Sequence, residues 1–231
     1  MVTYEQFLQH LSILPGITAI IGGGGKTSLL LYLASVLQKR ASVLLATSTH
    51  IYPPDNYPFR LRIDEPIAKG TCITVGAPSQ GGKITAPQQD FASLRGYADY
   101  LIVEADGAKG RPLKAHAAHE PVIPGGSGTV IAVIGADGIG QTVSEAAHRP
   151  ELYAEKLGIG LDTVVTPMLA AAMIKRYPLV TGVVVNKADS VLRLNAARET
   201  AALLPFPCAI TAFHSEQKLV ELWRNGTCLL L

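Results

Sequence analysis

Short runs of apolar, largely β-branched residues recur along the chain and set its predicted architecture. Seven such runs occupy 17–21, 42–46, 71–75, 100–104, 129–134, 181–185 and about 208–211. Most are continuous rather than alternating, which is typical of strands buried on both faces of a parallel sheet. The pattern therefore predicts a layer of strands covered by helices on both sides.

Segments with helix signals lie before and between these runs. Thr3 and Gln6 have the spacing of a capping box, which predicts a short first helix through Leu11. Further helices are expected over 27–39, 87–97, 167–177, 189–204 and about 215–225. Pro87 falls in the first turn of the second of these, and Thr166 is placed to cap the third. Strands that alternate with helices indicate βαβ units and a mostly parallel sheet.

Four consecutive glycines separate the first strand from the helix that follows it. Gly22, Gly23, Gly24 and Gly25 precede Lys26, Thr27 and Ser28. Glycines let the backbone turn its N–H groups toward phosphate oxygens, and the helix N-terminus adds partial positive charge. In such a loop Lys26 reaches the β- and γ-phosphates, and the Thr27 hydroxyl binds Mg²⁺. The alternative is a tight glycine turn without a ligand, but such a turn does not require a Lys-Thr pair after the glycines.

This loop is shorter than the usual phosphate-binding motif. That motif has a glycine six residues before its lysine, a position that Ile20 occupies in this chain. The shortened G-x-x-G-K-T form resembles the loop of the ATP-dependent Mur ligases. We therefore expect a three-layer, P-loop NTPase-like α/β fold, with a mostly parallel sheet of about seven strands flanked by helices. A single nucleotide-binding domain is expected over 1–231.

The run at 100–104 leads into a pair of acidic residues, Glu104 and Asp106. A carboxylate at the carboxyl end of a strand beside a phosphate loop is placed to hold Mg²⁺, directly or through water. Glu104 is alternatively a residue that activates water near the γ-phosphate. The predicted catalytic residues are thus Lys26, Glu104 and Asp106, and the predicted metal ligands are Thr27 and Glu104. An ordinary acidic turn is the other interpretation, since Asp-Gly is a common turn pair.

The run at 181–185 leads into Asn186, Lys187, Ala188 and Asp189. This N-K-x-D sequence resembles the guanine-recognition motif of GTPases, in which the carboxylate accepts hydrogen bonds from guanine and the lysine stem covers the ring. Adenine lacks that pair of donors, so Asp189 would be left unpaired against ATP. The alternative is a plain strand-to-turn segment with a helix cap. This motif favours GTP, whereas the short phosphate loop favours ATP.

Further polar residues follow other predicted strands. Candidates for binding phosphate or a second substrate are Thr49, His50, Lys109, Arg111, Lys114, His119 and Glu120. The basic residues come directly after the acidic strand end, where anion binding and a solvated surface are equally open interpretations. His116, His119 and Glu120 fit a polar loop better than a metal site. Residues 135–138 end another strand and are expected near the same crevice.

Composition narrows the class of protein. Of 231 residues, 48% are hydrophobic and 16% charged, and the net charge of +2 is not concentrated in a run. We therefore expect no nucleic-acid or membrane-surface partner. The N-terminus lacks a signal-peptide pattern, and no apolar run is long enough to span a membrane. Cys72, Cys208 and Cys228 lie far apart without a C-x-x-C motif, which predicts reduced thiols in a cytoplasmic protein, two of them core residues.

Several motifs in this order resemble those of the YqeC family of selenium-dependent molybdenum hydroxylase accessory proteins. They are Ile-Gly-Gly-Gly-Gly-Lys-Thr, Ala-Thr-Ser-Thr-His-Ile, Val-Glu-Ala-Asp-Gly-Ala-Lys-Gly-Arg-Pro-Leu-Lys-Ala, His-Glu-Pro-Val-Ile-Pro and Asn-Lys-Ala-Asp. The resemblance covers about 17–190. His116 and Ala118 depart from it, standing where the family pattern has proline and an acidic residue, so Lys114, His119 and Glu120 are the preferred candidates in that segment.

The resemblance implies a maturation factor for enzymes that carry a selenium-containing molybdenum cofactor. A molybdenum hydroxylase or a protein of the selenophosphate synthetase pathway is then the expected partner. Three functions follow: a Mg²⁺-dependent GTP or ATP hydrolase, an ATP-dependent transferase or ligase acting on a small acid or cofactor precursor, and a module that binds nucleotide without hydrolysis. Nucleotide choice and turnover distinguish them.

Overall fold

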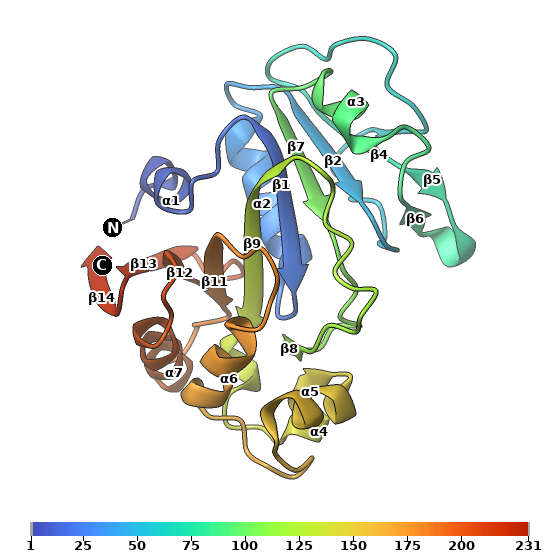
Figure 1. Ribbon diagram of the computed structural model, residues 1–231. Helices are drawn as coiled ribbons and strands as arrows, with labels where there is room; N and C mark the ends of the chain where they lie inside the picture. Colours follow the sequence, from blue (N-terminus) through green and yellow to red (C-terminus); the bar gives the residue numbers. More distant parts are fainter. Residues whose placement is uncertain (1, 231) are drawn as a thin grey trace.

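The computed structural model describes residues 2–230, which form a large sheet with helices packed on it (Figure 1). The helices are α1 (Tyr4–His10), α2 (Lys26–Leu37), α3 (Phe91–Arg95), α4 (Val143–Ala146), α5 (Pro150–Leu157), α6 (Pro167–Ile174) and α7 (Val191–Ala202). The main-sheet strands are β1 (Gly16–Gly22), β2 (Val43–Thr47), β3 (Phe59–Arg60), β4 (Cys72–Val75), β7 (Tyr100–Glu104), β9 (Ser127–Gly135), β11 (Gly182–Asn186), β12 (Cys208–Thr211), β13 (Leu219–Arg224) and β14 (Thr227–Leu230).

Ten strands make this sheet, in the order β14-β13-β12-β11-β9-β1-β7-β2-β4-β3. All neighbours from β12 to β3 pair in parallel, and β13 and β14 add antiparallel strands at one edge. Strand β1, which leads into the glycine loop, lies between β9 and β7 near the middle. The carboxyl ends of these central strands therefore meet around that loop.

Helices cover both faces of the sheet and make three layers. On one face α1 and α2 pack through Phe7, Leu30 and Leu33 against alternate strand residues such as Ile20 and Val133. On the other face α4–α7 pack against the intervening strand residues, and α3 packs near β7. The predicted three-layer, mostly parallel α/β fold is confirmed. Among the helices of residues 2–230, none combines the length and apolar character that a membrane crossing requires.

Two of the predicted helix starts are confirmed by their hydrogen bonds. The Thr3 hydroxyl accepts from the Gln6 N–H at 3.2 Å, and the Gln6 side chain accepts from the Thr3 N–H at 2.9 Å. Thr166 accepts from the Leu169 N–H at 3.3 Å ahead of Pro167 at the first helical position of α6. These caps satisfy N–H groups that the helix itself leaves unpaired.

The predicted helix over 87–97 is shorter than expected. The Asp90 carboxylate accepts from the Ser93 N–H at 2.8 Å, so the helix begins after Asp90 and ends at Arg95. Pro87 lies in the irregular segment before this cap rather than in the first turn. The Asp90 N-cap, and not Pro87, therefore determines where the helix begins.

The helix predicted over about 215–225 is wrong, because this segment contains strand β13. Val220 and Trp223 are residue types that strands favour, and Glu221 interrupts an otherwise apolar run over 219–223. The Glu221 side chain is only 2% exposed, and a buried carboxylate needs hydrogen-bond partners. The Arg198 guanidinium and the indole N–H of Trp223 both donate to it. Strands β3, β13 and β14 account for the difference between seven predicted strands and ten.

Six smaller elements were not anticipated. They are β5 (Ala77–Pro78) and β6 (Ile84–Thr85), which form a hairpin, β8 (Leu113–Lys114) and β10 (Ala147–His148), which pair in parallel, and two 3₁₀ turns at Gln80–Gly82 and Ala136–Gly138. Helices α4 and α5 were also unpredicted. The β8–β10 pair matters most for function, because it holds the segment after β7 against the residues that begin α5.

Two cysteines are core residues, as expected. Cys72 and Cys208 are buried in β4 and β12, and burial raises the pKa of each thiol to about 12. A thiol with so high a pKa carries almost no thiolate at neutral pH and is a poor nucleophile. These two residues therefore fill the core and are unsuited to carry selenium.

His10 joins the first helix to the added edge strand and should make stability depend on pH. Its Nε2 lies 3.0 Å from the Trp223 carbonyl oxygen, and burial lowers its pKa below the ordinary 6.5. As the pH falls, the unfolded chain therefore protonates His10 at a higher pH than the folded chain does. The contribution of His10 to stability is fully present above pH 6.5 and is lost as the pH drops below that value. We expect the thermal midpoint of the wild type to fall faster than that of His10→Gln in acid. Parallel midpoint curves would contradict this role.

Candidate functional site

The glycine loop connects β1 to α2 and is packed too tightly for other residues. Gly24 has φ of +71°, and a Cβ there would lie 2.0 Å from the Gly135 nitrogen. Gly25 has φ of +122°, and a Cβ there would lie 2.3 Å from the Asn186 Nδ2. Both the left-handed backbone and the lack of space require glycine. The loop is thus pressed against the carboxyl ends of β9 and β11.

Lys26 begins α2, and its side chain turns back under the loop. The side chain is 5% exposed, and its Nζ donates to the Gly22 carbonyl at 2.7 Å. The same nitrogen lies 3.1 Å from the Asp106 Oδ1 and 3.7 Å from the Glu104 Oε1. A buried ammonium needs such partners, because its desolvation is costly. Lys26, Glu104 and Asp106, predicted as one catalytic group, therefore lie together.

Thr27 and Glu104, the predicted metal ligands, are also in contact. The Thr27 hydroxyl donates to the Glu104 Oε2 at 3.0 Å. Burial raises the pKa of Glu104, although Lys26 and the Thr27 hydroxyl oppose the shift. A hydroxyl and a carboxylate are hard oxygen donors that suit Mg²⁺, which typically takes one or two protein ligands besides phosphate oxygens and water. Within residues 2–230 there is no cluster of three His, Cys, Asp or Glu side chains around a common metal position.

Asp106 is the most connected side chain of the site and is fully buried. Its Oδ2 accepts from the Gly22 N–H at 2.8 Å and contacts the His116 Nε2, while the Lys114 Nζ lies 3.6 Å away. Burial by itself would raise the pKa of Asp106, but Lys26, His116 and Lys114 lower it below the ordinary value. The residue is therefore an ionised carboxylate that binds the loop backbone and cations around it.

A second set of ion pairs extends from Asp106 away from the loop. Lys114, fully buried, lies 3.1 Å from the Glu120 Oε1, and the Glu120 Oε2 lies 3.2 Å from the Arg149 Nη2. Burial would raise the pKa of Glu120, but Lys114 and Arg149 lower it. Lys114 and Glu120 were predicted as site residues, and the structure brings them together.

His116 and Arg149 belong to this cluster but were not selected from the sequence. His116 is 7% exposed, and its ring stacks edge-on against Tyr177 with centroids 4.3 Å apart. The contact of His116 with Asp106, ten residues earlier in the chain, had no local signal in the sequence. Arg149 had no local signal, because only the β8–β10 pairing brings it beside Lys114.

The N-K-x-D segment follows β11 next to the loop. The Asn186 side chain donates to the Gly24 carbonyl at 3.0 Å and accepts from the Thr211 hydroxyl at 3.1 Å. Lys187 has φ of +64° and pairs with Asp137 at 2.7 Å. Asp189 is partly exposed and pairs with Arg193 at 2.7 Å. Asn186 thus ties the loop to the sheet, and the contact of Asp189 with a base stays a prediction.

The other predicted residues lie around this centre rather than in it. Ser28 has its hydroxyl 3.3 Å from the His214 Nε2. Thr49 and His50 follow β2, where the Thr47 hydroxyl binds the Glu104 carbonyl and the Thr49 backbone. Arg111 is exposed and binds the Glu145 carbonyl, and Lys109 and His119 are exposed. These residues do not contact Lys26.

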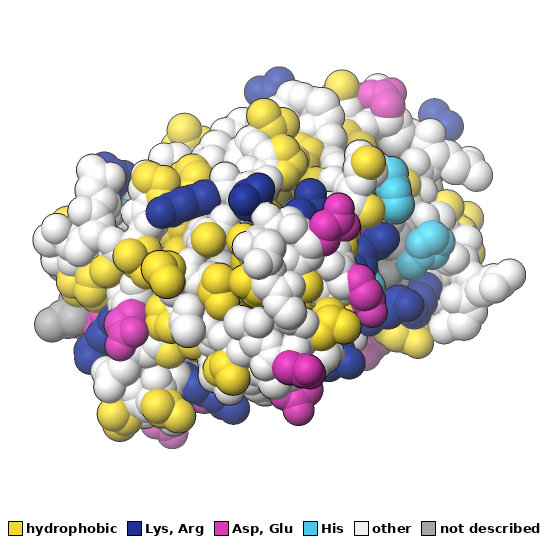
Figure 2. All heavy atoms as spheres, turned by 60° about the horizontal axis from the view of Figure 1, so that its bottom comes forward, with side chains coloured by type: hydrophobic (Ala, Val, Ile, Leu, Met, Phe, Trp, Pro, Cys, Tyr) yellow, Lys and Arg dark blue, Asp and Glu magenta, His cyan; other side chains and the backbone are white. Residues whose placement is uncertain are grey.

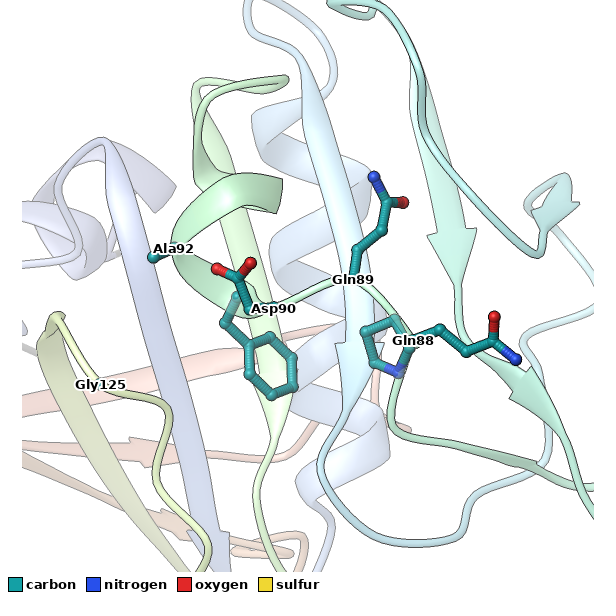
Figure 3. Close-up of a pocket in the computed structure, with 7 residues that line it drawn as sticks. Gln88, Gln89, Asp90, Ala92 and Gly125 are labelled. Atoms are coloured by element: carbon teal, nitrogen blue, oxygen red, sulfur yellow. The ribbon is translucent and has the colours of Figure 1, made fainter.

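A pocket of about 370 Å³ lies elsewhere, beside α3 and Gly125 (Figure 3). Its polar side chains already have partners: Asp90 caps α3, and the Gln89 amide makes hydrogen bonds of 2.8 Å to both backbone groups of Ile63. Figure 3 shows Gln88 pointing away from Asp90. This pocket lacks the clustered charges of the glycine loop, so the loop is the candidate site.

The fold and the loop define an α/β protein of the three-layer, P-loop-like class. Comparison with known proteins gives the family. The family model described as YqeC protein matches residues 18–151. The Uncharacterized protein YqeC of Escherichia coli (strain K12) is 34% identical over 177 residues, which cover 71% of this chain and 69% of that protein. The chain belongs to the YqeC family, as its motifs indicated.

The packing of Gly24 can be tested by adding one methyl group. Gly24→Ala should destabilise the protein by about 1–3 kcal/mol, because the methyl group meets the backbone of Gly135 at a left-handed position. Gly128→Ala is the matched control, since a Cβ there meets nothing within 4 Å and its backbone is not left-handed. Urea unfolding measures both. Equal stability of the two variants would contradict the tight packing of the loop.

Proposed function

We propose that this protein binds a nucleoside triphosphate with Mg²⁺ at the glycine loop and hydrolyses it slowly. In this proposal the N–H groups of 25–28 surround the phosphates and Lys26 contacts the β- and γ-phosphates. The N–H groups of Gly22, Gly23 and Gly24 already donate to Asp106 and to two backbone carbonyls, so they shape the loop. Thr27 and Glu104 hold Mg²⁺, which supplies charge neutralisation on the phosphate oxygens. Glu104 or Asp106 orients the attacking water.

One observation carries the proposal: a buried lysine at the start of α2 is surrounded by oxygen atoms from Gly22, Glu104 and Asp106. Placing two carboxylates and an ammonium beneath a tightly packed glycine loop costs desolvation energy, and a core of apolar residues would avoid that cost. Such an arrangement is typical of a site that exchanges its internal partners for an anionic ligand. A triphosphate beside Mg²⁺ fits the charges that are present.

The proposed biological role is accessory: maturation of selenium-dependent molybdenum hydroxylases in the cytoplasm. Membership of the YqeC family supports this role. The proposed partner is a molybdenum hydroxylase or a protein of the selenophosphate synthetase pathway. Nucleotide hydrolysis would then drive a step of cofactor delivery.

A second candidate function is an ATP-dependent transferase or ligase for a small acid or cofactor precursor. The buried ion pairs from Asp106 through Lys114 and Glu120 to Arg149 favour it, because they extend the charged region beyond what a triphosphate needs. Turnover that requires a second substrate would distinguish this function from a hydrolase. Binding without any turnover would indicate a module that only holds nucleotide.

Lys26→Ala should abolish triphosphate binding. In the proposed complex the Lys26 ammonium leaves the carboxylates and binds phosphate oxygens, and the variant lacks this ammonium. Isothermal titration calorimetry with GTP or ATP and Mg²⁺ measures the loss. Lys39→Ala, an exposed lysine beyond the other end of the same helix, is the control that should bind normally. Unchanged affinity in Lys26→Ala would disprove the site.

Asp189→Ala tests which base is bound. We expect GTP binding to weaken by about 1–3 kcal/mol, the cost of leaving buried guanine donors unpaired, while ATP binding is unchanged. Arg193→Ala is the matched control, because it removes the partner of Asp189 and keeps the carboxylate. An equal loss for GTP and ATP in Asp189→Ala would count against guanine recognition.

A further inference from the structure

Arg149 has a backbone conformation that its residue type disfavours. It has φ of +62° and ψ of +64° at the N-cap of α5, where its side chain makes no capping hydrogen bond. Glycine would adopt this conformation without strain. Lys109, with φ of +48°, shares the left-handed conformation. Backbone strain of this kind is retained where the side chain is needed, so both cations are candidates for a functional role.

Arg149 directly follows a histidine that ends a short strand. Strand β10 pairs with β8, which places His148 opposite Lys114 and Arg149 directly after it. Burial lowers the pKa of His148, and the charges of Lys114, Arg149 and Lys109 lower it further, against the opposing effect of Glu120. His148 and Arg149 therefore follow one another at the end of a short strand, against Lys114 on the neighbouring strand.

The Arg149 guanidinium is only partly engaged. Its side chain is 34% exposed, and its Nη2 contacts Glu120, while its Nε is buried without a hydrogen-bond partner. Arginine has five N–H donors, arranged to bind phosphate or carboxylate with two parallel hydrogen bonds. Figure 2 brings forward the end of the molecule that carries β8 and α5, and it shows Lys, Arg and His side chains gathered beside acidic ones.

We propose that His148 and Arg149 bind the oxyanion group, phosphate or carboxylate, of a second substrate. The role of this oxyanion site in catalysis rests on the proposed function. Glu120, which is itself paired with Lys114, forms an ion pair with the Arg149 guanidinium.

This oxyanion site is distinct from the phosphate loop but connected to it. Four successive ion pairs lead from Lys26 through Asp106, Lys114 and Glu120 to Arg149. A ligand at one end changes the charge balance of the carboxylates that hold the other end.

Isothermal titration of inorganic phosphate into the full chain tests the site, with acetate as the carboxylate probe. The loop is first saturated with a non-hydrolysable GTP analogue and Mg²⁺, and the titration is repeated on Lys26→Ala without nucleotide. We expect phosphate binding in both cases. Arg149→Gly should weaken it at least about tenfold, because the guanidinium fork is lost, and Arg149→Lys should be intermediate. The stronger of the two probes identifies the class of oxyanion.

Arg149→Gly also relieves the left-handed backbone, so its thermal midpoint should equal or exceed that of the wild type. Arg40→Ala, which breaks an exposed pair with Glu5 at 3.8 Å, is the control with unchanged phosphate affinity. Unchanged affinity in Arg149→Gly, loss of binding in Lys26→Ala alone, or no binding of either probe to the wild type would overturn the proposal. Phosphate binding that depends on Arg149, in a protein that binds no nucleotide, would support the oxyanion site and refute the proposed function.

Discussion

The ionised carboxylate of Asp106 is the group on which the candidate site depends. It is fully buried, accepts the N–H of Gly22, and contacts Lys26, His116 and Lys114. It thereby joins the glycine loop to the segment that follows β7. Removing one partner of a buried ion pair costs about 3–5 kcal/mol, because the remaining charge loses its compensation. Loop, helix start and acidic strand end are consequently held as one unit.

This arrangement also explains how Lys26 can be buried. The carboxylates of Asp106 and Glu104 lie beside the Lys26 ammonium, where phosphate oxygens would lie in the proposed complex. The buried ammonium therefore has a counter-charge. The buried charges cost more than apolar packing would, and that cost is acceptable where function needs the charges. Arg149 adds backbone strain at the far end of the same ion-pair series. Polar burial and strain therefore concentrate at one edge of an otherwise apolar sheet.

Much of the fold could be predicted because it depends on local signals. Continuous apolar runs marked the central strands, and capping residues marked α1 and α6. Strand β13 was missed because Glu221, a charged residue in the core, interrupts its apolar run, and the partner of Glu221, Arg198, is distant in sequence. A local pattern cannot show that a charge far along the chain will neutralise a buried carboxylate.

The same reasoning separates the predictable part of the site from the rest. Lys26, Thr27, Glu104 and Asp106 come from two strand ends that a parallel sheet brings together, so their contact followed from topology. Arg149 depends on the pairing of β8 with β10, two strands of two residues each that have no pattern of their own. His116 was set aside because it departs from the family motif, yet it binds Asp106.

Binding of a triphosphate with Mg²⁺ at the glycine loop is tested most directly by thermal unfolding of the wild-type protein with GTP, ATP and their diphosphates. A ligand that binds only the folded state raises the unfolding midpoint, by an amount that grows with the logarithm of its concentration divided by its dissociation constant. We predict that a triphosphate with Mg²⁺ raises the midpoint and that removing Mg²⁺ reduces the shift. An unchanged midpoint with every nucleotide at millimolar concentration would contradict nucleotide binding.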